Sequence, residues 1–386
     1  MKLRAYQFFT PTQIIFGWQS IRKLPQIIFG YGKKVLLVTG HTAARKAGIL
    51  TGVQKLLEEK KIDVTIFDNV EPEPSCDTVN SAVALAKARD CDVVIGLGGG
   101  SALDVAKAIA GIFNTGLPVE EFHSGAKHLL QPGLPLIAIP TTSGTGSEVT
   151  PNCVLIDSRK KIKKSFRSDH LFARVAIVDP ELTLGLPPQQ TAYSGMDALC
   201  QSIESFVSKD ANPLTDAIAL QSIRLVKNNL MQAYTNEHDK DARIAMSYAA
   251  LFSGIALTNA KMGAVHGIVP QLGTYYNVSH GLLCGLLLPA VMEFNVDIAG
   301  AKYAHIAAIF GQNVKEMHNI DAGRKAIESI KKFLADLQFP AGLKALGIQE
   351  KNFSKIAKES MPSGSLKANP KRVTEQNVID ILRNCL

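Results

Sequence analysis

The pattern of secondary-structure signals changes sharply near residue 188 of this 386-residue chain. Before that point, short β-branched and aliphatic runs alternate with amphipathic stretches. After it, strand signals nearly vanish, and helical periods rich in Ala, Leu and Ile continue to the C-terminus. Alternation of buried strands with helices is typical of a parallel, doubly wound sheet. The sequence therefore predicts an α/β domain over residues 1–187 and an all-helical domain over residues 188–386.

Chain length supports two domains, because 386 residues are too many for one compact core. The composition is that of an ordinary globular protein, with 46% hydrophobic and 20% charged residues. We expect strands at 34–40, 64–70, 92–100, 135–142 and 175–180, separated by helices at about 43–59, 77–89 and 101–112.

The N-terminal segment, the longest apolar run and the cysteines indicate the cellular compartment of the protein. Pro11 and polar residues stand where a signal peptide needs an unbroken apolar core. The apolar run at 281–292 is too short to span a bilayer and is interrupted by Gly285 and Pro289. Six scattered cysteines without a CxxC pair are expected where thiols stay reduced. These features predict a cytoplasmic protein without a membrane partner.

A formal net charge of +8 raises the question of a nucleic-acid partner. The basic residues are spread along the chain apart from "RKKIKK" at 159–164, and no interleaved aromatic residues or zinc-finger spacing accompany that run. We interpret the run as the solvated edge of a hairpin and expect no nucleic-acid partner. Small anionic cofactors or acidic substrates remain compatible with the charge.

A glycine-rich strand-to-helix turn lies in "VVIGLGGGSALDVAKAIA", residues 93–110. Ser101 is expected to cap the helix, with Asp104 at the third helical position as its capping partner. Glycines let backbone N–H groups approach a pyrophosphate, and a helix N-terminus offers it unpaired donors. The turn is not a GxGxxG fingerprint, since Ser101 stands at the third glycine position. Nucleotide binding is favoured over the alternative of a simple tight turn.

A second loop, "AIPTTSGTGSEVTP" at 138–151, also follows a predicted strand. Its hydroxyl residues and glycines are rich in donors and would lie at the carboxyl edge of the sheet, where open α/β folds bind ligands. A polar surface loop is the alternative. Two such loops after two strands of one sheet favour the ligand site.

The helical half holds a candidate metal site. In "GMDALCQSIESF" at 195–206, Asp197 and Gln201 lie four residues apart and so share one helix face. His266 and His280 stand fourteen residues apart in apolar sequence. One such histidine is more often a core residue, but two with an upstream carboxylate favour a divalent cation, although spacing alone leaves both interpretations open. Cys284, one helical turn after His280, is expected to be a core residue.

The sequence resembles the iron-containing (group III) alcohol dehydrogenase family over essentially its whole length. The resemblance implies a Rossmann-like dinucleotide domain, a helical domain carrying a divalent metal, and NAD(P)-linked interconversion of alcohols with aldehydes or ketones. It also implies that a homodimer can form through the N-terminal strand region. The shared motifs are "FG" at 16–17, "GGGSALDVAKAIA" at 98–110, "PTTSGTGSEVT" at 140–150, "DPELTLGLPP" at 179–188, "GMDAL" at 195–199, "NPLTDAIALQSIRL" at 212–225 and the segments around His266 and His280.

The resemblance also implies roles for individual residues. The expected metal ligands, which are also the expected catalytic groups, are Asp197, His266 and His280, and Gln201 stands where most members place a fourth ligand, a histidine. The residues expected to contact the dinucleotide are Gly98, Gly99, Gly100 and Ser101 at the pyrophosphate with Asp104 supporting them, Thr141, Thr142 and Thr145 beside the nicotinamide and ribose, Lys163 at a sugar, Leu182 at the adenine and Gly40 at the adenosine ribose.

Two departures from the family pattern affect the chemistry. The amide oxygen of Gln201 is a weaker donor than imidazole, so the site should hold Fe²⁺ less well than a site with three histidines. Three strong ligands with an open position are also a catalytic zinc pattern, so we expect Fe²⁺ or Zn²⁺. Pro270 replaces a further histidine that many members carry near the nicotinamide, which removes a candidate proton carrier.

A third departure concerns the choice of nucleotide. Gly40 ends a predicted strand where NAD-preferring members carry Asp, whose carboxylate would bind the ribose hydroxyls and repel a 2′-phosphate. His41 and Arg45 can supply positive charge nearby. We expect NADPH to be accepted in preference to NADH.

Together these features predict an NAD(P)-dependent alcohol dehydrogenase or aldehyde reductase that acts on a small alcohol or carbonyl substrate, with a divalent metal as Lewis acid. One alternative is a metal-independent reductase that resembles maleylacetate reductases and acts on an acidic substrate. Others are a lyase resembling dehydroquinate synthase and a non-catalytic dinucleotide-binding subunit.

Overall fold

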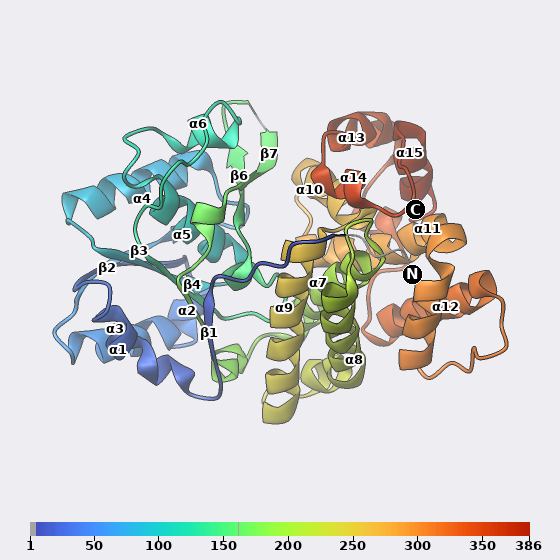
Figure 1. The fold of residues 1–386 in the computed structure, drawn as a ribbon, viewed down its shortest axis with the longest axis horizontal. Coiled ribbons are helices and arrows are strands. Elements are labelled where there is room, and N and C mark those ends of the chain that lie inside the picture. Colours follow the sequence, from blue (N-terminus) through green and yellow to red (C-terminus); the bar gives the residue numbers. More distant parts are fainter. Residues whose placement is uncertain (1–4, 161) are drawn as a thin grey trace. The chain divides into compact units, whose positions relative to one another are not determined.

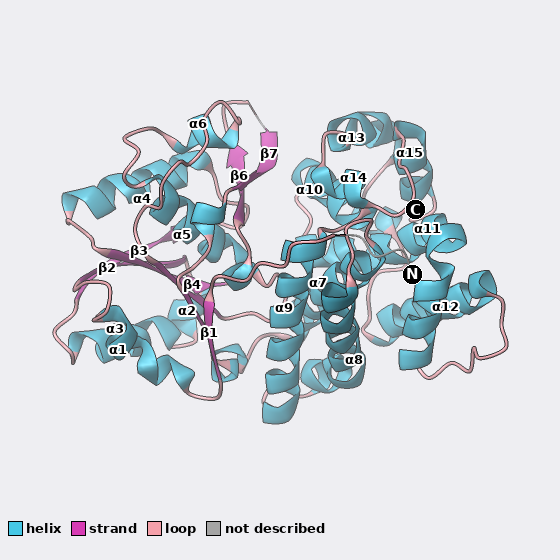
Figure 2. Ribbon diagram, viewed as in Figure 1, coloured by secondary structure: helices cyan, strands magenta, loops and turns pink. Residues whose placement is uncertain are grey.

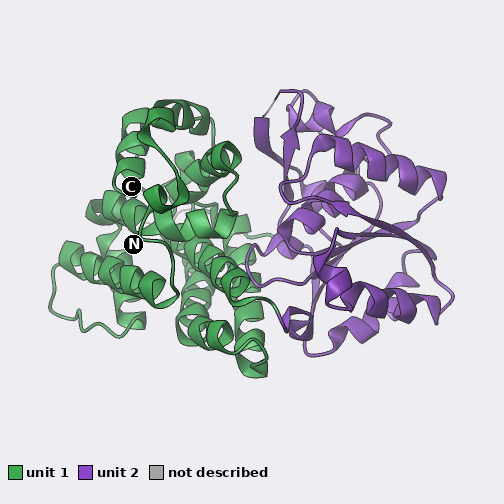
Figure 3. Cartoon of the chain, turned by 180° about the vertical axis from the view of Figure 1, so that it is seen from behind, with its two compact units in different colours: residues 1–9, 186–386 green, residues 10–185 purple. Residues whose placement is uncertain are grey.

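The computed structural model describes residues 5–160 and 162–386. The chain forms two compact units, drawn in different colours in Figure 3. One unit is Thr10–Gly185, and the other is Leu186–Leu386 together with the N-terminal residues up to Phe9. The start of the chain thus differs from our expectation, because it belongs with the helical unit. Phe9 is held there by Asn259, whose side chain accepts the Phe9 N–H at 2.6 Å and donates to the Phe9 carbonyl at 3.2 Å.

The unit Thr10–Gly185 contains a parallel sheet of six strands among the described residues, in the order β1-β8-β5-β4-β2-β3. The five predicted strands are present, whereas β1 was not predicted because four residues at a sheet edge give too short a pattern. The strands are β1 (Gln13–Phe16), β2 (Lys34–Gly40), β3 (Asp63–Val70), β4 (Val93–Gly98), β5 (Leu136–Pro140) and β8 (Val175–Val178).

Helices cover both faces of this sheet, as a doubly wound fold requires (Figure 1). Side chains alternate along β2, so Leu36 and Val38 enter one core while Val35 and Leu37 enter the other. The predicted helix at 43–59 is two helices, because Gly48 adopts a left-handed φ of 72° between them. The helices are α1 (Leu24–Ile28), α2 (Ala43–Lys46), α3 (Ile49–Glu58), α4 (Cys76–Ala88), α5 (Gly100–Ile112) and α6 (Val119–His123).

The predicted hairpin at the basic run is present as β6 (Asn152–Asp157) paired antiparallel with β7 (Ile162–Arg167). Residue 161 of that run lies outside the described residues. We had expected the whole edge of this hairpin to be exposed to solvent, but part of it is buried. Lys163 is only 7% exposed and forms an ion pair with Glu73.

The other unit is helical, and Figure 2 shows helices and loops without strands in its described part. Its core is apolar and built from Ala, Val, Leu, Ile and Met side chains of most of its helices. Its helices are α7 (Pro188–Val207), α8 (Pro213–Thr235), α9 (Lys240–Ala260), α10 (Ala264–Tyr276), α11 (His280–Ile309), α12 (Asn319–Asp336), α13 (Phe353–Ser360), α14 (Gly364–Ala368) and α15 (Glu375–Arg383).

Helix α11 runs unbroken for 30 residues through Gly285 and Pro289, so the apolar run that we expected to be too short to span a bilayer is part of a longer helix. By length and composition it is apolar enough to cross a membrane, but 67% of its most apolar window is buried inside the structure. Its small residues allow close packing. A Cβ on Gly281 would lie 2.2 Å from the Tyr193 carbonyl oxygen on α7, and one on Gly285 would lie 2.5 Å from the Phe339 ring. The apolar composition therefore fits a core helix.

Replacement of Gly281 by Ala should destabilise the helical unit, because the added methyl group meets a backbone oxygen that cannot move without displacing α7. We expect Gly281→Ala to lower the free energy of unfolding by about 1–3 kcal/mol. Urea denaturation measures this change. Gly364→Ala is the control, since a Cβ there meets nothing within 4 Å. Equal stability of the two variants would contradict the packing described here.

Candidate functional site

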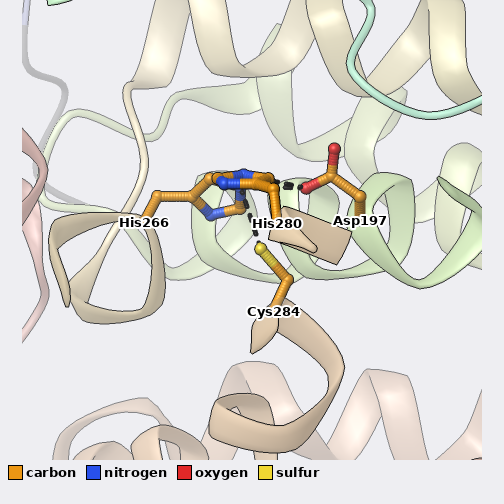
Figure 4. Close-up of side chains that lie close together, drawn as sticks. All are labelled: Asp197, His266, His280 and Cys284. Carbon is orange, nitrogen blue, oxygen red and sulfur yellow. Dashed lines mark hydrogen bonds and ion pairs between the residues drawn. The ribbon is translucent and has the colours of Figure 1, made fainter. Parts of the chain in front are cut away.

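Three residues from three helices of the helical unit point toward one another (Figure 4). Asp197 lies in the middle of α7, His266 in the first turn of α10, and His280 is the first residue of α11. The Asp197 Oδ1 atom lies 3.2 Å from His266 Nε2 and 3.6 Å from His280 Nε2. One carboxylate oxygen thus faces two imidazole nitrogens, at residues that are far apart in the sequence.

Solvent exposure differs within this group. The side chains of Asp197 and His266 are 3% and 5% exposed, whereas that of His280 is 33% exposed. His280 is therefore the most solvent-exposed member of the group.

A buried carboxylate that the sequence analysis missed, Glu204, holds His266 in place. Its Oε2 atom lies 2.6 Å from His266 Nδ1, and its Oε1 atom accepts the Val265 N–H at 2.6 Å. When Nδ1–H donates to Glu204, the lone pair of Nε2 faces Asp197, which is how carboxylates orient metal-binding histidines. The signal was present in the sequence, since Glu204 follows Asp197 by seven residues on the same face of α7.

Gln201 lies beside the group but does not turn its oxygen toward it. Its Nε2 donates to Asp197 Oδ2 at 3.1 Å, and its Oε1 accepts from the Ser253 hydroxyl at 2.8 Å. The amide therefore fixes one oxygen of Asp197 and leaves the other facing the histidines. The metal-ligand role that we expected for Gln201 would need its amide turned over.

Two buried cysteines flank the His266 ring. Cys284 Sγ lies 3.7 Å from Nε2, and Cys200 Sγ lies 4.0 Å from Nδ1. Asp197, His266, His280 and Cys284 each offer a ligand atom, and these four atoms lie within 4.8 Å of one another. The structure thus adds a thiol to the three groups expected from the sequence.

The electrostatics of the site favour positive charge at its centre. Burial raises the pKa of Asp197, but His280 and His266 outweigh burial and lower it. Burial lowers the pKa of His266, yet its interactions with Cys284, Asp197 and Glu204 raise it well above its usual value. Burial also raises the pKa of the Cys284 thiol. A field that holds a proton on a buried imidazole is also suited to a cation.

In the α/β unit, the two expected nucleotide loops adjoin each other because β4 and β5 are neighbours. The Thr141 N–H donates to the Gly98 carbonyl at 2.9 Å. A Cβ on Gly100 would lie 2.9 Å from the Thr145 methyl group, and one on Gly99 would lie 3.4 Å from Thr142. The glycines therefore permit the close approach of the threonine loop to the start of α5.

The start of α5 differs from our prediction. Gly99, in an extended conformation, is the N-cap, and the helix begins at Gly100, so Ser101 is already helical. Asp104 is not a capping partner. It accepts from the Ser147 hydroxyl at 2.7 Å and the Val154 N–H at 2.9 Å, and so ties α5 to the threonine loop and to β6.

The residues expected near the adenosine lie at the ends of two strands and in the hairpin. Gly40 ends β2, and Leu182 lies in the short helix Pro180–Thr183 that follows β8. Arg45, which we expected to supply positive charge, forms an ion pair with Asp68 of β3. Its charge is therefore partly offset.

Pro270 lies inside α10, one turn after His266.

Comparison with known proteins establishes the family. Residues 11–180 match the iron-containing alcohol dehydrogenase family, and residues 191–386 match the C-terminal part of the Fe-containing alcohol dehydrogenase family. This chain belongs to the iron-containing alcohol dehydrogenase family. It is therefore an oxidoreductase acting on CH–OH groups. The family implies a nicotinamide cofactor and a metal, with iron favoured.

Relatives of the chain are dehydrogenases and reductases of small molecules. It is 38% identical to 1,3-propanediol dehydrogenase of Klebsiella pneumoniae, over 99% of both chains. It is 33% identical to the NAD-dependent methanol dehydrogenase of Bacillus methanolicus, over 98% of this chain and 99% of that one. A solved structure of 1,3-propanediol oxidoreductase is 36% identical and superposes with a TM-score of 0.95, over 99% of this chain and 100% of that one. The similarity thus extends through both units.

The role of Glu204 can be tested with Glu204→Gln, which keeps an acceptor oxygen but removes the charge. We expect the affinity for Zn²⁺ to fall about 10- to 100-fold, as for other carboxylates that orient metal-binding histidines. Competition with a chelating dye measures the affinity. Glu293→Gln is the control, because that residue forms an exposed ion pair with Arg324. An unchanged affinity of Glu204→Gln would show that the carboxylate does not support metal binding.

Proposed function

We propose that the chain is an NAD(P)-dependent alcohol dehydrogenase or aldehyde reductase that uses Asp197, His266 and His280 to hold a divalent metal. The observation that carries this proposal is the convergence of the carboxylate and the two Nε2 atoms at 3.2 and 3.6 Å. A bound Fe²⁺ or Zn²⁺ would supply a Lewis acid for the oxygen of a small alcohol or carbonyl substrate.

The residues of the chain prepare this site. Glu204 accepts the Nδ1 proton of His266 and so keeps the lone pair of Nε2 directed at the site. Gln201 holds Asp197 Oδ2 by a hydrogen bond, which leaves Oδ1 for the centre. His280 is the most exposed of the three proposed ligands and is proposed to lie nearest the substrate.

The cofactor is proposed to bind at the two loops of the α/β unit. The N–H groups of Gly100 and Ser101, at the start of α5, are not used by a side-chain cap and suit a pyrophosphate. Thr141, Thr142 and Thr145 follow the neighbouring strand β5 and are proposed to contact the nicotinamide and ribose. Lys163 and Leu182 are proposed to contact the sugar and the adenine.

The substrate is proposed to be a small alcohol or aldehyde, as the names of the relatives suggest. We also propose a cytoplasmic protein without nucleic-acid or membrane partners, in line with its free, buried cysteines. A homodimer is proposed to form at β1, which is an edge strand of the sheet. Size-exclusion chromatography with light scattering tests the oligomeric state.

A metal-independent reductase acting on an acidic substrate is the second candidate. It is favoured by one observation, that the amide oxygen of Gln201 accepts from Ser253 instead of facing the histidines. It predicts activity that survives chelation.

Metal content and chelation distinguish the two candidates. We expect protein purified anaerobically to contain about one Zn or Fe per chain, and its aldehyde reduction with NADPH to disappear on chelation and return with metal. Full activity after chelation would favour the metal-independent reductase. Cofactor binding without turnover on any substrate tested would indicate a non-catalytic subunit.

The variant His280→Ala extends this test to one ligand. We expect at least a ~100-fold loss of both metal affinity and turnover, because the loss of an imidazole ligand should cost no less than the loss of a residue that merely orients one. The control is His238→Ala, since His238 is 70% exposed and pairs only with Glu237 among the ion pairs of the described residues. Full activity of His280→Ala would contradict the proposed site.

Nucleotide preference can be tested at the end of β2. A Cβ on Gly40 would lie 3.6 Å from the Val70 carbonyl oxygen, an ordinary contact, so Gly40→Asp should fold normally. We expect wild type to prefer NADPH and the variant to lower the ratio of kcat/KM for NADPH over NADH at least ~10-fold, since the carboxylate repels a 2′-phosphate.

The control for this substitution is Gly52→Asp on α3, where a Cβ meets nothing within 4 Å. It adds the same charge to the same unit and should leave the ratio unchanged. A wild-type preference for NADH would overturn the expected cofactor choice.

A further inference from the structure

The thiol of Cys284 is the member of the site that the proposed function leaves unused. Cys284 lies on α11 one helical turn after His280, and its side chain is fully buried. Figure 4 shows its sulfur directed toward the two imidazole rings. It lies 3.7 Å from His266 Nε2, the nitrogen that also faces Asp197. A buried thiol beside proposed metal ligands offers a strong ligand for the same ion.

Two distances within the group are close to those expected of ligands around one ion, and the third that joins proposed ligands, from His280 Nε2 to Asp197 Oδ1, is longer at 3.6 Å. A tetrahedral zinc ion with bonds of about 2.0 Å to oxygen and nitrogen and about 2.3 Å to sulfur separates N from O by about 3.3 Å and N from S by about 3.5 Å. The corresponding distances here are 3.2 Å from His266 Nε2 to Asp197 Oδ1 and 3.7 Å from His266 Nε2 to Cys284 Sγ.

Gln201 is less suited to be the fourth ligand. In the present arrangement its Oε1 atom accepts from Ser253, and turning the amide over would give up that hydrogen bond. Asp197 would lose its donor at the same time. The present arrangement satisfies both ends of the amide, through Asp197 and Ser253.

Cys200 is also close to His266 but contacts the other nitrogen of the ring. Its Sγ atom is 4.0 Å from Nδ1, the nitrogen that Glu204 engages at 2.6 Å. The nitrogen that Cys200 contacts is therefore not the one proposed to face the metal. Because it is equally buried, this cysteine is a matched control for Cys284.

We propose that Cys284 is the fourth protein ligand of the metal, with Asp197, His266 and His280, and that Gln201 is a positioning residue for Asp197. This inference rests on the proposed metal-dependent function. On binding, the S–H bond of Cys284 breaks, the sulfur bonds to the ion and the proton leaves to solvent. Because thiolate is a soft ligand, the site should favour Zn²⁺ over Fe²⁺ more strongly than a site with three histidines.

X-ray absorption at the zinc edge tests the ligand directly in the full-length protein. We expect one sulfur neighbour at about 2.3 Å in wild type. The same sulfur should persist in Cys200→Ser and in Gln201→Ala, and it should be replaced by oxygen or nitrogen in Cys284→Ser. The Co²⁺-substituted proteins should follow the same pattern in their thiolate-to-cobalt charge-transfer absorption. Zn²⁺ affinity should fall at least ~10-fold in Cys284→Ser and stay within about 2-fold of wild type in Cys200→Ser.

The outcomes separate this inference from the proposed function. Bound zinc with only oxygen and nitrogen neighbours in wild type would overturn the role of Cys284 but leave the metal-dependent function intact. A wild-type protein that takes up no metal would overturn both. The wild-type spectrum decides even where Cys284→Ser does not fold.

Discussion

The contact between Glu204 and His266 is the interaction on which the rest of the metal site depends. Removing a carboxylate from water costs several kcal/mol, so Glu204 must be compensated where it lies. The compensation comes from the ring N–H of His266 and from the Val265 N–H at the start of α10, where the helix dipole also favours negative charge. One side chain thereby caps a helix and selects the tautomer of a proposed ligand.

In the α/β unit, the two loops proposed to bind the nucleotide are positioned largely by the backbone. Parallel strands end at one edge of the sheet, so the neighbouring strands β4 and β5 bring their following loops together. Glycines at 99 and 100 allow the threonine loop to approach, and Asp104 fixes that loop from the first turns of α5. The surface proposed for the dinucleotide is thus held by contacts within the unit.

The sequence predicted five of the six strands of the parallel sheet, the change to helices and the convergence of Asp197, His266 and His280, because these follow from periodicity and family motifs. It did not predict which side chains from other helices contact these three residues. Glu204 was overlooked because helical spacing shows which residues share a face but not which distant residue approaches that face. The same limit explains Cys284. The N-cap was misassigned because Gly99 takes the extended conformation that Ser101 was expected to take.

Asp197 and Glu204 belong to one helix, yet they engage opposite nitrogens of the same imidazole ring. These two contacts with α7 restrain the His266 ring at both nitrogens, so the ring has little rotational freedom before an ion binds. Because this side chain is already ordered, binding an ion should cost little further conformational entropy at His266. The larger ordering cost should fall on His280, whose side chain is more exposed. The rigidity of a single helix thus becomes preorganisation of the site.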